Sequence, residues 1–184
     1  MFFLSRTARI GVQLNVPMTY ELKCDMHAPV PLAEVFKFFE NPRNLARITP
    51  PELSFSVTTP GEIKMRKGAQ IDYTIRWLGL PMRWRTLITD YTPPFSFVDE
   101  QAKGPYTLWR HCHEFREVEG GTVISDCVHY ELPLGPLGRI AHELMVGNQL
   151  RRIFSFRQRA IAKILAFPGI RFTDPVIGTL VKNR

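Results

Sequence analysis

GPYTLWRHCHEFREVEGGTVISDCVHYELP, residues 104–133, is the stretch that decides the fold. GPYTLWRHCHEF predicts one strand and TVISDCVHYELP the next, with Glu119-Gly120-Gly121 as the tight turn between them. GPLG follows, and then a helix-like run over about residues 137–165. A long antiparallel hairpin joined directly to a long C-terminal helix is typical of a curved sheet wrapped around a helix, with a cavity between them.

Periodicity and turn residues predict the other elements. Strands are expected over 19–27, 53–58, 69–78, 82–89 and 95–101. A short amphipathic helix is expected over 32–39, and Asn41 is placed to cap a second one that has Pro42 in its first turn. The long helix places one apolar stripe toward the sheet, interrupted at 147–149, where a kink is expected; its members are Ile140, Leu144, Ile153, Phe154, Ile161 and Leu165.

Length and composition indicate one domain with enough core to fold unaided. The chain has 184 residues, and no apolar run approaches the ~18 residues that a membrane-spanning helix requires. Its three cysteines, Cys24, Cys112 and Cys127, form no CxxC motif and favour reduced thiols in the cytoplasm. We expect an N-terminal extension over 1–18, a domain over 19–167 and a tail over 168–184, in which residues 176–181 pack as a turn of helix.

Positive charge gathers in the C-terminal segment. From Pro136 onward the sequence has nine basic and two acidic residues, which accounts for the whole net charge of +7. Such a segment is typical of contacts with an anionic membrane, nucleic acid or an acidic partner, although a solvated helix face has the same composition. We expect no nucleic acid, and we take Arg151, Arg152 and Arg159 as candidate contacts for an anionic membrane or an acidic protein. The protein is thus expected to be cytoplasmic and peripheral to the membrane.

Several local motifs occur in a characteristic order across about 150 residues. They are Ala28-Pro29 before Val35-Phe36-Lys37-Phe38-Phe39, Asn41-Pro42-Arg43-Asn44-Leu45, Gly104-Pro105-Tyr106 with Trp109, His111 and Phe115, then Asp126, Val128, Tyr130 and Pro133, and Ile153-Phe154-Ser155-Phe156-Arg157. In these motifs and their order the chain resembles the START-like superfamily (the SRPBCC, helix-grip or Bet v1-like group), especially bacterial members labelled ligand-binding or cyclase/dehydratase-like. The resemblance implies an α+β fold: a seven-stranded antiparallel sheet gripping the C-terminal helix, with two short helices after the first strand and an apolar cavity. It leaves function open, because the fold hosts lipid carriers, hormone receptors, quinone chaperones and aromatase/cyclases.

Chemistry is expected where His111 and His113 share a strand face. Asp126 on the neighbouring strand is expected to approach them, and a histidine oriented by a carboxylate is suited to general acid–base catalysis. The same contact also serves simply to fix strand register. Two histidines without a clear third ligand predict no metal site, and no cofactor is expected. The candidate ligand-binding residues are Tyr73, Trp84, Trp109, His111, His113, Asp126, Tyr130, Leu144 and Asn148.

Three functions are compatible with these observations. The first is non-enzymatic binding or transport of a hydrophobic small molecule, such as a lipid, a quinone or a polyketide-like compound. The second is an aromatase/cyclase-like enzyme that uses His111, His113 and Asp126 for acid–base chemistry. The third is a protein-interaction module that acts through the basic helix.

Overall fold

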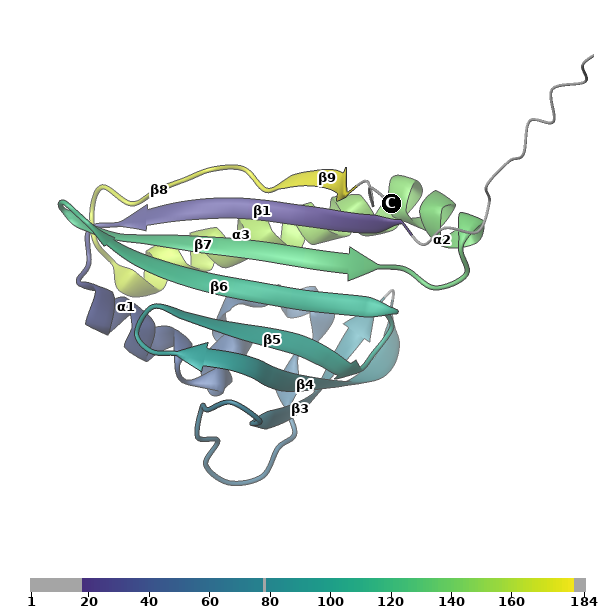
Figure 1. Ribbon diagram of the computed structural model, residues 1–184, viewed down its shortest axis with the longest axis horizontal. Coiled ribbons are helices and arrows are strands. Elements are labelled where there is room, and N and C mark those ends of the chain that lie inside the picture. The colour runs from purple at the N-terminus through teal and green to yellow at the C-terminus, as the bar shows by residue number, and fades with distance from the viewer. Residues whose placement is uncertain (1–17, 78, 181–184) are drawn as a thin grey trace, which may run out of the picture.

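A computed structural model describes residues 18–77 and 79–180 (Figure 1). The extension expected over 1–18 lies, except for Met18, outside the described residues. The elements are β1 (Thr19–Ala28), α1 (Leu32–Phe39), the 3₁₀ helices η1 (Pro42–Ile48) and η2 (Pro51–Leu53), β2 (Ser56–Val57), β3 (Gln70–Trp77), β4 (Leu80–Thr92), β5 (Ser96–Lys103), β6 (Leu108–Val118), β7 (Gly121–Glu131), α2 (Pro136–Ala141), the π-helical turn η3 (His142–Val146), α3 (Gly147–Leu165), β8 (Arg171–Phe172) and β9 (Val176–Leu180).

The strands form one antiparallel sheet in the order β2-β3-β4-β5-β6-β7-β1-β8, with β9 also paired to β1. Its nine strands exceed the seven expected, because the tail adds two strands beside β1. The turn of helix expected over 176–181 is therefore wrong: β9 occupies 176–180. Residues 168–180 extend the sheet edge that β1 would otherwise leave unpaired.

The hairpin of β6 and β7 pairs His113 with Asp126 and Trp109 with Tyr130, so Asp126 lies beside the histidines as expected. Gly121 has a φ of 147° at its turn, and a Cβ there would overlap the carbonyl oxygen of Ala28. Only glycine lets the hairpin approach the end of β1 this closely.

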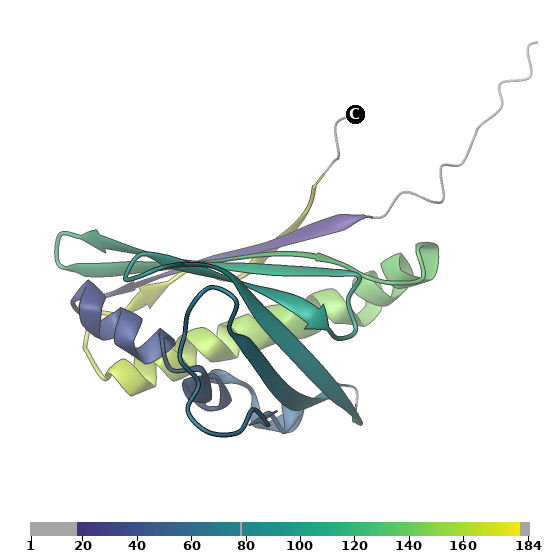
Figure 2. The same ribbon diagram turned by 60° about the horizontal axis from the view of Figure 1, so that its bottom comes forward.

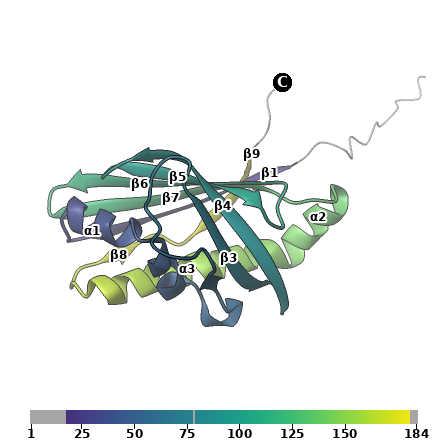
Figure 3. The ribbon, with the colours of Figure 1, turned by 90° about the horizontal axis from the view of Figure 1, so that it is seen from below.

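The long C-terminal helix runs along one face of the sheet, and β3 and β4 bend toward it (Figures 2 and 3). Phe154 and Ile161 are buried as the expected stripe requires, but Ile140 and Leu144 are 55% and 77% exposed. The stripe is wrong at these two residues because η3 inserts one extra residue just before Gly147. One extra residue rotates the preceding part of a helix by about 100°, which turns Ile140 and Leu144 outward and His142 inward.

Helix α1 lies at the end of the sheet opposite α2 (Figure 1). Helix α1 buries Leu32, Val35, Phe36 and Phe39 on one face, as its spacing predicts. The side chain of Asn41 accepts a hydrogen bond from the backbone N–H of Arg43 at 3.0 Å and caps η1, which begins at Pro42.

No helix within residues 18–77 and 79–180 is long and apolar enough to cross a membrane.

Candidate functional site

A cavity lies between the sheet, α3 and the short helices. Its volume is about 190 Å³, far more than the ~10–15 Å³ that holds one water molecule. Side chains from the sheet, from α3 and from the 38–55 segment line it, and most of them are apolar: Phe38, Phe39, Leu45, Ile48, Leu53, Phe55, Met65, Ile71, Ile75, Ile88, Phe97, Leu150, Ile153 and Phe154 among them. The cavity therefore suits a hydrophobic molecule.

Aromatic rings build one wall of this cavity. Trp84 stacks on Tyr73 with ring centroids 5.8 Å apart and meets Trp109 edge-on at 5.5 Å. Tyr106 packs against both tryptophans. Paired rings of this kind stabilise one another by about 0.5–1.5 kcal/mol per pair beyond the area that they bury. Tyr73, Trp84 and Trp109, three of the predicted ligand-binding residues, lie here.

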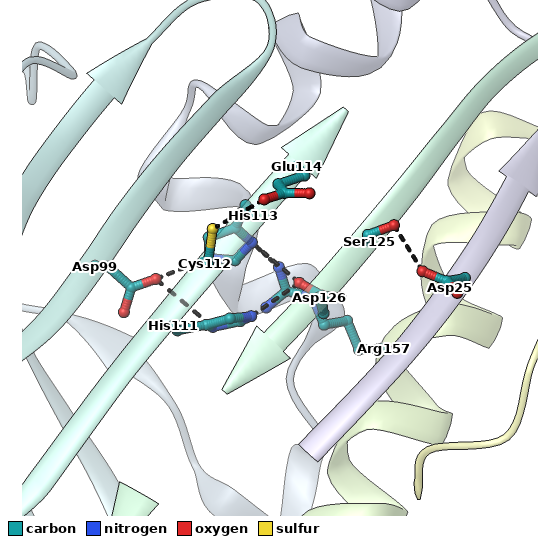
Figure 4. Close-up of polar contacts among 9 residues, drawn as sticks. All are labelled: Asp25, Asp99, His111, Cys112, His113, Glu114, Ser125, Asp126 and Arg157. Carbon is teal, nitrogen blue, oxygen red and sulfur yellow. Dashed lines mark hydrogen bonds and ion pairs between the residues drawn. The ribbon is translucent and has the colours of Figure 1, made fainter. Parts of the chain in front are cut away.

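Five ionisable side chains meet at another part of the wall (Figure 4). The Oδ1 atom of Asp126 lies 2.8 Å from Nε2 of His111 and 3.0 Å from Nδ1 of His113. Asp99 approaches the same two rings from the other side, with its Oδ2 atom 2.8 Å from Nε2 of His113. The guanidinium of Arg157 completes the group, with its Nε atom 3.7 Å from Oδ2 of Asp126. We call these five residues the charged cluster.

Burial and mutual contact shift the pKa values within the charged cluster. Burial and the neighbouring His113 lower the pKa of His111 to about 4. Burial also acts to lower the pKa of His113, but hydrogen bonds to Asp126 and Asp99 outweigh it and raise that pKa. Burial acts to raise the pKa of Asp126, yet Arg157 and the two histidines hold it well below its usual range. Burial acts to raise the pKa of Asp99 as well, but the hydrogen bond to His113 and the nearby cationic groups lower it, so both carboxylates favour the ionised form.

Two residues of the cavity wall carry a buried donor without a hydrogen bond. Nε1 of Trp84 and Nε of Arg157 are buried and lack a hydrogen-bond partner within the described part of the chain. Both residues line the cavity and are more than nine-tenths buried. Nε of Arg157 still has Asp126 as its ion-pair partner at 3.7 Å, whereas Nε1 of Trp84 is a buried donor whose hydrogen bond a ligand oxygen could supply.

The other predicted site residues lie apart from the cavity. Tyr130 is fully buried, but its hydroxyl lies 2.8 Å from Nε2 of His142 and it does not line the cavity. Leu144 and Asn148 are exposed and border a separate surface groove. Asp126 is placed behind the two histidines and reaches the cavity only through them.

Sequence reasoning missed Asp99 and Arg157. A signal for Arg157 was present, because it falls between Phe154 and Ile161 on the buried stripe of the long helix, where a charge needs a partner. Asp99 follows Phe97 at the two-residue spacing of one strand face, but locating it beside His111 requires the pairing of β5 with β6.

No protein-family model and no curated protein matches this chain. Solved structures do resemble it. Protein Ms6760 from Mycobacterium smegmatis is 18% identical, with a TM-score of 0.58, over 79% of this chain and 90% of that one. TTHA0849 from Thermus thermophilus is 15% identical, with a TM-score of 0.60, over 79% and 97%. The major latex-like protein 151 from Panax ginseng is 13% identical, with a TM-score of 0.56, over 79% and 97%.

The chain has the START-like, or Bet v1-like, helix-grip fold. The expectation from the sequence motifs is confirmed at this level. A helix-grip sheet curved around a long helix accounts for the position of the cavity, which is enclosed by the inner faces of β3 to β6 and by α3.

Proposed function

We propose that the protein binds and carries a hydrophobic small molecule in its cavity, of the lipid, quinone or polyketide-like class. One observation carries this proposal: an apolar cavity has in its lining four members of the charged cluster (Asp99, His111, His113 and Arg157) and Trp84, whose indole N–H is unpaired within the described residues. The apolar lining supplies affinity, and the polar wall orients one oxygen-bearing end of the ligand.

The first experiment is native mass spectrometry of protein purified from its own source, followed by denaturing extraction. A stoichiometric mass that leaves on denaturation supports the proposal and identifies the ligand class. A second measurement is displacement of the anionic fluorophore anilinonaphthalene sulfonate by a fatty acid and by a quinone. An apo mass together with no displacement by either compound overturns the proposal.

A variant pair locates the binding. Ile75 lines the cavity, whereas its neighbour on the same strand, Arg76, is exposed. Ile75→Trp should fill the cavity and weaken binding at least tenfold, while Arg76→Trp adds the same ring outside and should leave binding unchanged. Equal effects of the two substitutions would contradict binding inside the cavity.

A surface beside the cavity favours exchange of the ligand with a membrane. Leu137, Ile140 and Leu144 are 66%, 55% and 77% exposed, and Arg151 and Arg152 are exposed further along the same helical segment. Such a surface is suited to an anionic bilayer, because the apolar side chains can insert into the bilayer and the arginines are attracted by its negative charge.

The adjoining groove links this surface to the cavity. It is bordered by Leu144 and Arg152 and shares Leu53, Gln149 and Ile153 with the cavity lining. A ligand leaving the cavity through this groove would therefore emerge at the proposed membrane contact. This supports a carrier that loads or unloads at a bilayer.

Vesicle sedimentation tests the membrane contact. Arg151→Glu with Arg152→Glu should abolish binding to vesicles that contain phosphatidylserine, and binding of the unsubstituted protein should weaken with salt. Lys37→Glu with Arg116→Glu makes the same charge change on α1 and near the tip of the β6–β7 hairpin, away from α2 (Figure 1), and should leave binding intact. If the variant with Arg151→Glu and Arg152→Glu still binds the vesicles, the proposed membrane contact is wrong. It is also wrong if Arg151 and Arg152 bind another protein instead of a membrane.

A further inference from the structure

Three potential metal ligands converge at the cavity wall. One ligand atom from each of Asp99, His111 and His113 lies within 4.8 Å of the other two, and Oδ2 of Asp99 faces Nδ1 of His111 and Nε2 of His113. Asp99 and His111 are directly paired across β5 and β6, and His113 follows two residues later on the same strand face. All three side chains line the cavity.

Asp126 orients both imidazole rings toward this point. Its Oδ1 atom lies 2.8 Å from Nε2 of His111 and 3.0 Å from Nδ1 of His113, and it would accept from N–H groups at these two nitrogens when the opposite nitrogens bind a metal ion; Nδ1 of His113 also lies 3.4 Å from Nη2 of Arg157. Each ring therefore turns its other nitrogen toward Asp99, and in a neutral imidazole that nitrogen carries a lone pair. A carboxylate that accepts the outer N–H of a ligating histidine is the usual support of a metal site.

Either a proton on His113 or a cation between the three side chains could hold these facing atoms together. Oδ2 of Asp99 lies 2.8 Å from Nε2 of His113 and 3.6 Å from Nδ1 of His111. A proton on His113 explains the shorter distance only, since 3.6 Å exceeds a hydrogen bond. Ligand atoms of a tetrahedral site with bonds of about 2.0–2.1 Å are about 3.3 Å apart, a value that lies between the two distances.

We propose that Asp99, His111 and His113 bind a divalent transition-metal ion, Zn²⁺ or a close relative. Two imidazole nitrogens and one carboxylate oxygen are ligands that such ions prefer, and three protein ligands leave a coordination position open. Because all three ligands line the cavity, the open position faces the bound molecule.

The charges predict what fills the open position. Arg157 offsets Asp126, and Asp99 offsets one of the two charges of the ion, which leaves one positive charge at the cavity wall. An anionic oxygen, such as the carboxylate of a fatty acid, would neutralise it. This second part of the inference rests on the proposed function; the metal site itself does not.

A second cluster must be separated from this one in any test. Glu21, Cys127 and His129 also form a group with metal-ligand spacing, on the outer face of the sheet. There Nε2 of His129 is already paired with Glu21 at 2.8 Å, and Lys23 holds the same carboxylate. A thiol distinguishes this outer cluster, because thiolate coordinated to Co²⁺ adds an intense near-ultraviolet absorption band.

The experiment is a Co²⁺ and Zn²⁺ titration of the full chain after removal of metal with EDTA, with Cys127→Ser as the background. Cys127→Ser should bind one ion per chain, with the visible spectrum of tetrahedral Co²⁺ and no thiolate band. Adding His113→Gln should weaken binding at least 100-fold, and adding Asp126→Asn should weaken it 10- to 100-fold. Loss of binding in Cys127→Ser alone, or unchanged affinity in the His113→Gln background, overturns the site.

A measurement on the unsubstituted protein removes any dependence on folding of the variants. Nitrogen-15 spectra of the imidazoles should show Zn²⁺ on Nδ1 of His111 and on Nε2 of His113; shifts confined to His129 overturn the proposal.

Fatty-acid binding with and without Zn²⁺ then separates the two proposals. Tighter binding with Zn²⁺ supports the metal–ligand contact, and equal binding refutes that contact. If the protein binds fatty acid but no Zn²⁺, the metal site is refuted and the carrier function still holds. If it binds Zn²⁺ but neither fatty acid nor quinone, the carrier function is refuted and the metal site still holds.

Discussion

Replacing Arg157 by methionine should strongly destabilise the fold, although its ion pair is long. Nε of Arg157 lies 3.7 Å from Oδ2 of Asp126, and both side chains are less than one-tenth exposed. Removing one partner of a buried pair leaves the other charge without compensation, at a cost of about 3–5 kcal/mol. For a chain of this length we expect a fall in melting temperature of roughly 6–20 °C. Methionine retains most of the packing against Phe39 and Phe154, over whose rings the guanidinium lies.

A matched arginine–aspartate pair on the surface is the control. Arg85 and Asp72 form two short contacts, at 2.7 and 3.0 Å, but their side chains are 47% and 40% exposed. Arg85→Met should therefore change stability much less than Arg157→Met, despite its better geometry.

Urea denaturation in the presence of EDTA measures both variants together with the double variant Arg157→Met, Asp126→Asn. Removing the stranded charge should recover about 1–3 kcal/mol of the loss. A loss below about 1 kcal/mol for Arg157→Met, or no recovery in the double variant, would refute the reasoning that Arg157 compensates a buried charge.

Two further predictions concern stability. Gly121→Ala should cost about 1–3 kcal/mol more than Gly120→Ala in urea denaturation, because its Cβ would overlap the carbonyl of Ala28 whereas Gly120 faces open space; equal costs would contradict the close approach. Burial lowers the pKa of His142, whose Nε2 atom lies against the hydroxyl of Tyr130. The imidazole of His142 therefore binds a proton more readily in the unfolded chain than in the folded chain, so the free energy of unfolding should fall as pH falls through about 6.5. His142→Gln should reduce that fall, and unfolding curves from pH 8 to 5 that match the unsubstituted protein would contradict it.

The hairpin and its inward face were predictable because their evidence is local. Alternation puts His111 and His113 on one strand face, and pairing of the two strands through the Gly120-Gly121 turn predicts Asp126 beside them. The tail was expected to form a turn of helix, because its few residues show no alternation that would indicate a strand. Strand β9 forms through its pairing with β1, which the tail sequence alone does not reveal.

The helix shows where periodicity fails. Ile140 and Leu144 fit the stripe of a regular helix, and a single extra residue in η3 turns them to the surface. A sequence window averages over such an insertion and cannot locate it. The same limit hid Asp99, whose place beside His111 depends on the register between two strands.

The charged cluster is better explained by ligand recognition than by strand register. The alternating apolar residues of β6 and β7 and the close approach at Gly121 already fix the hairpin, so register does not require buried charges. Apolar side chains in place of His111, His113 and Asp99 would fill the cavity wall without removing charges from water, a substitution that is often neutral or stabilising. The cluster instead faces the cavity, where the side chain of Asp99 keeps 18% of its surface exposed. Ionisable groups that cost stability and line a cavity are expected where a polar ligand group or a metal ion has to be bound. We therefore infer that this wall, rather than the apolar lining, determines which molecule the protein accepts.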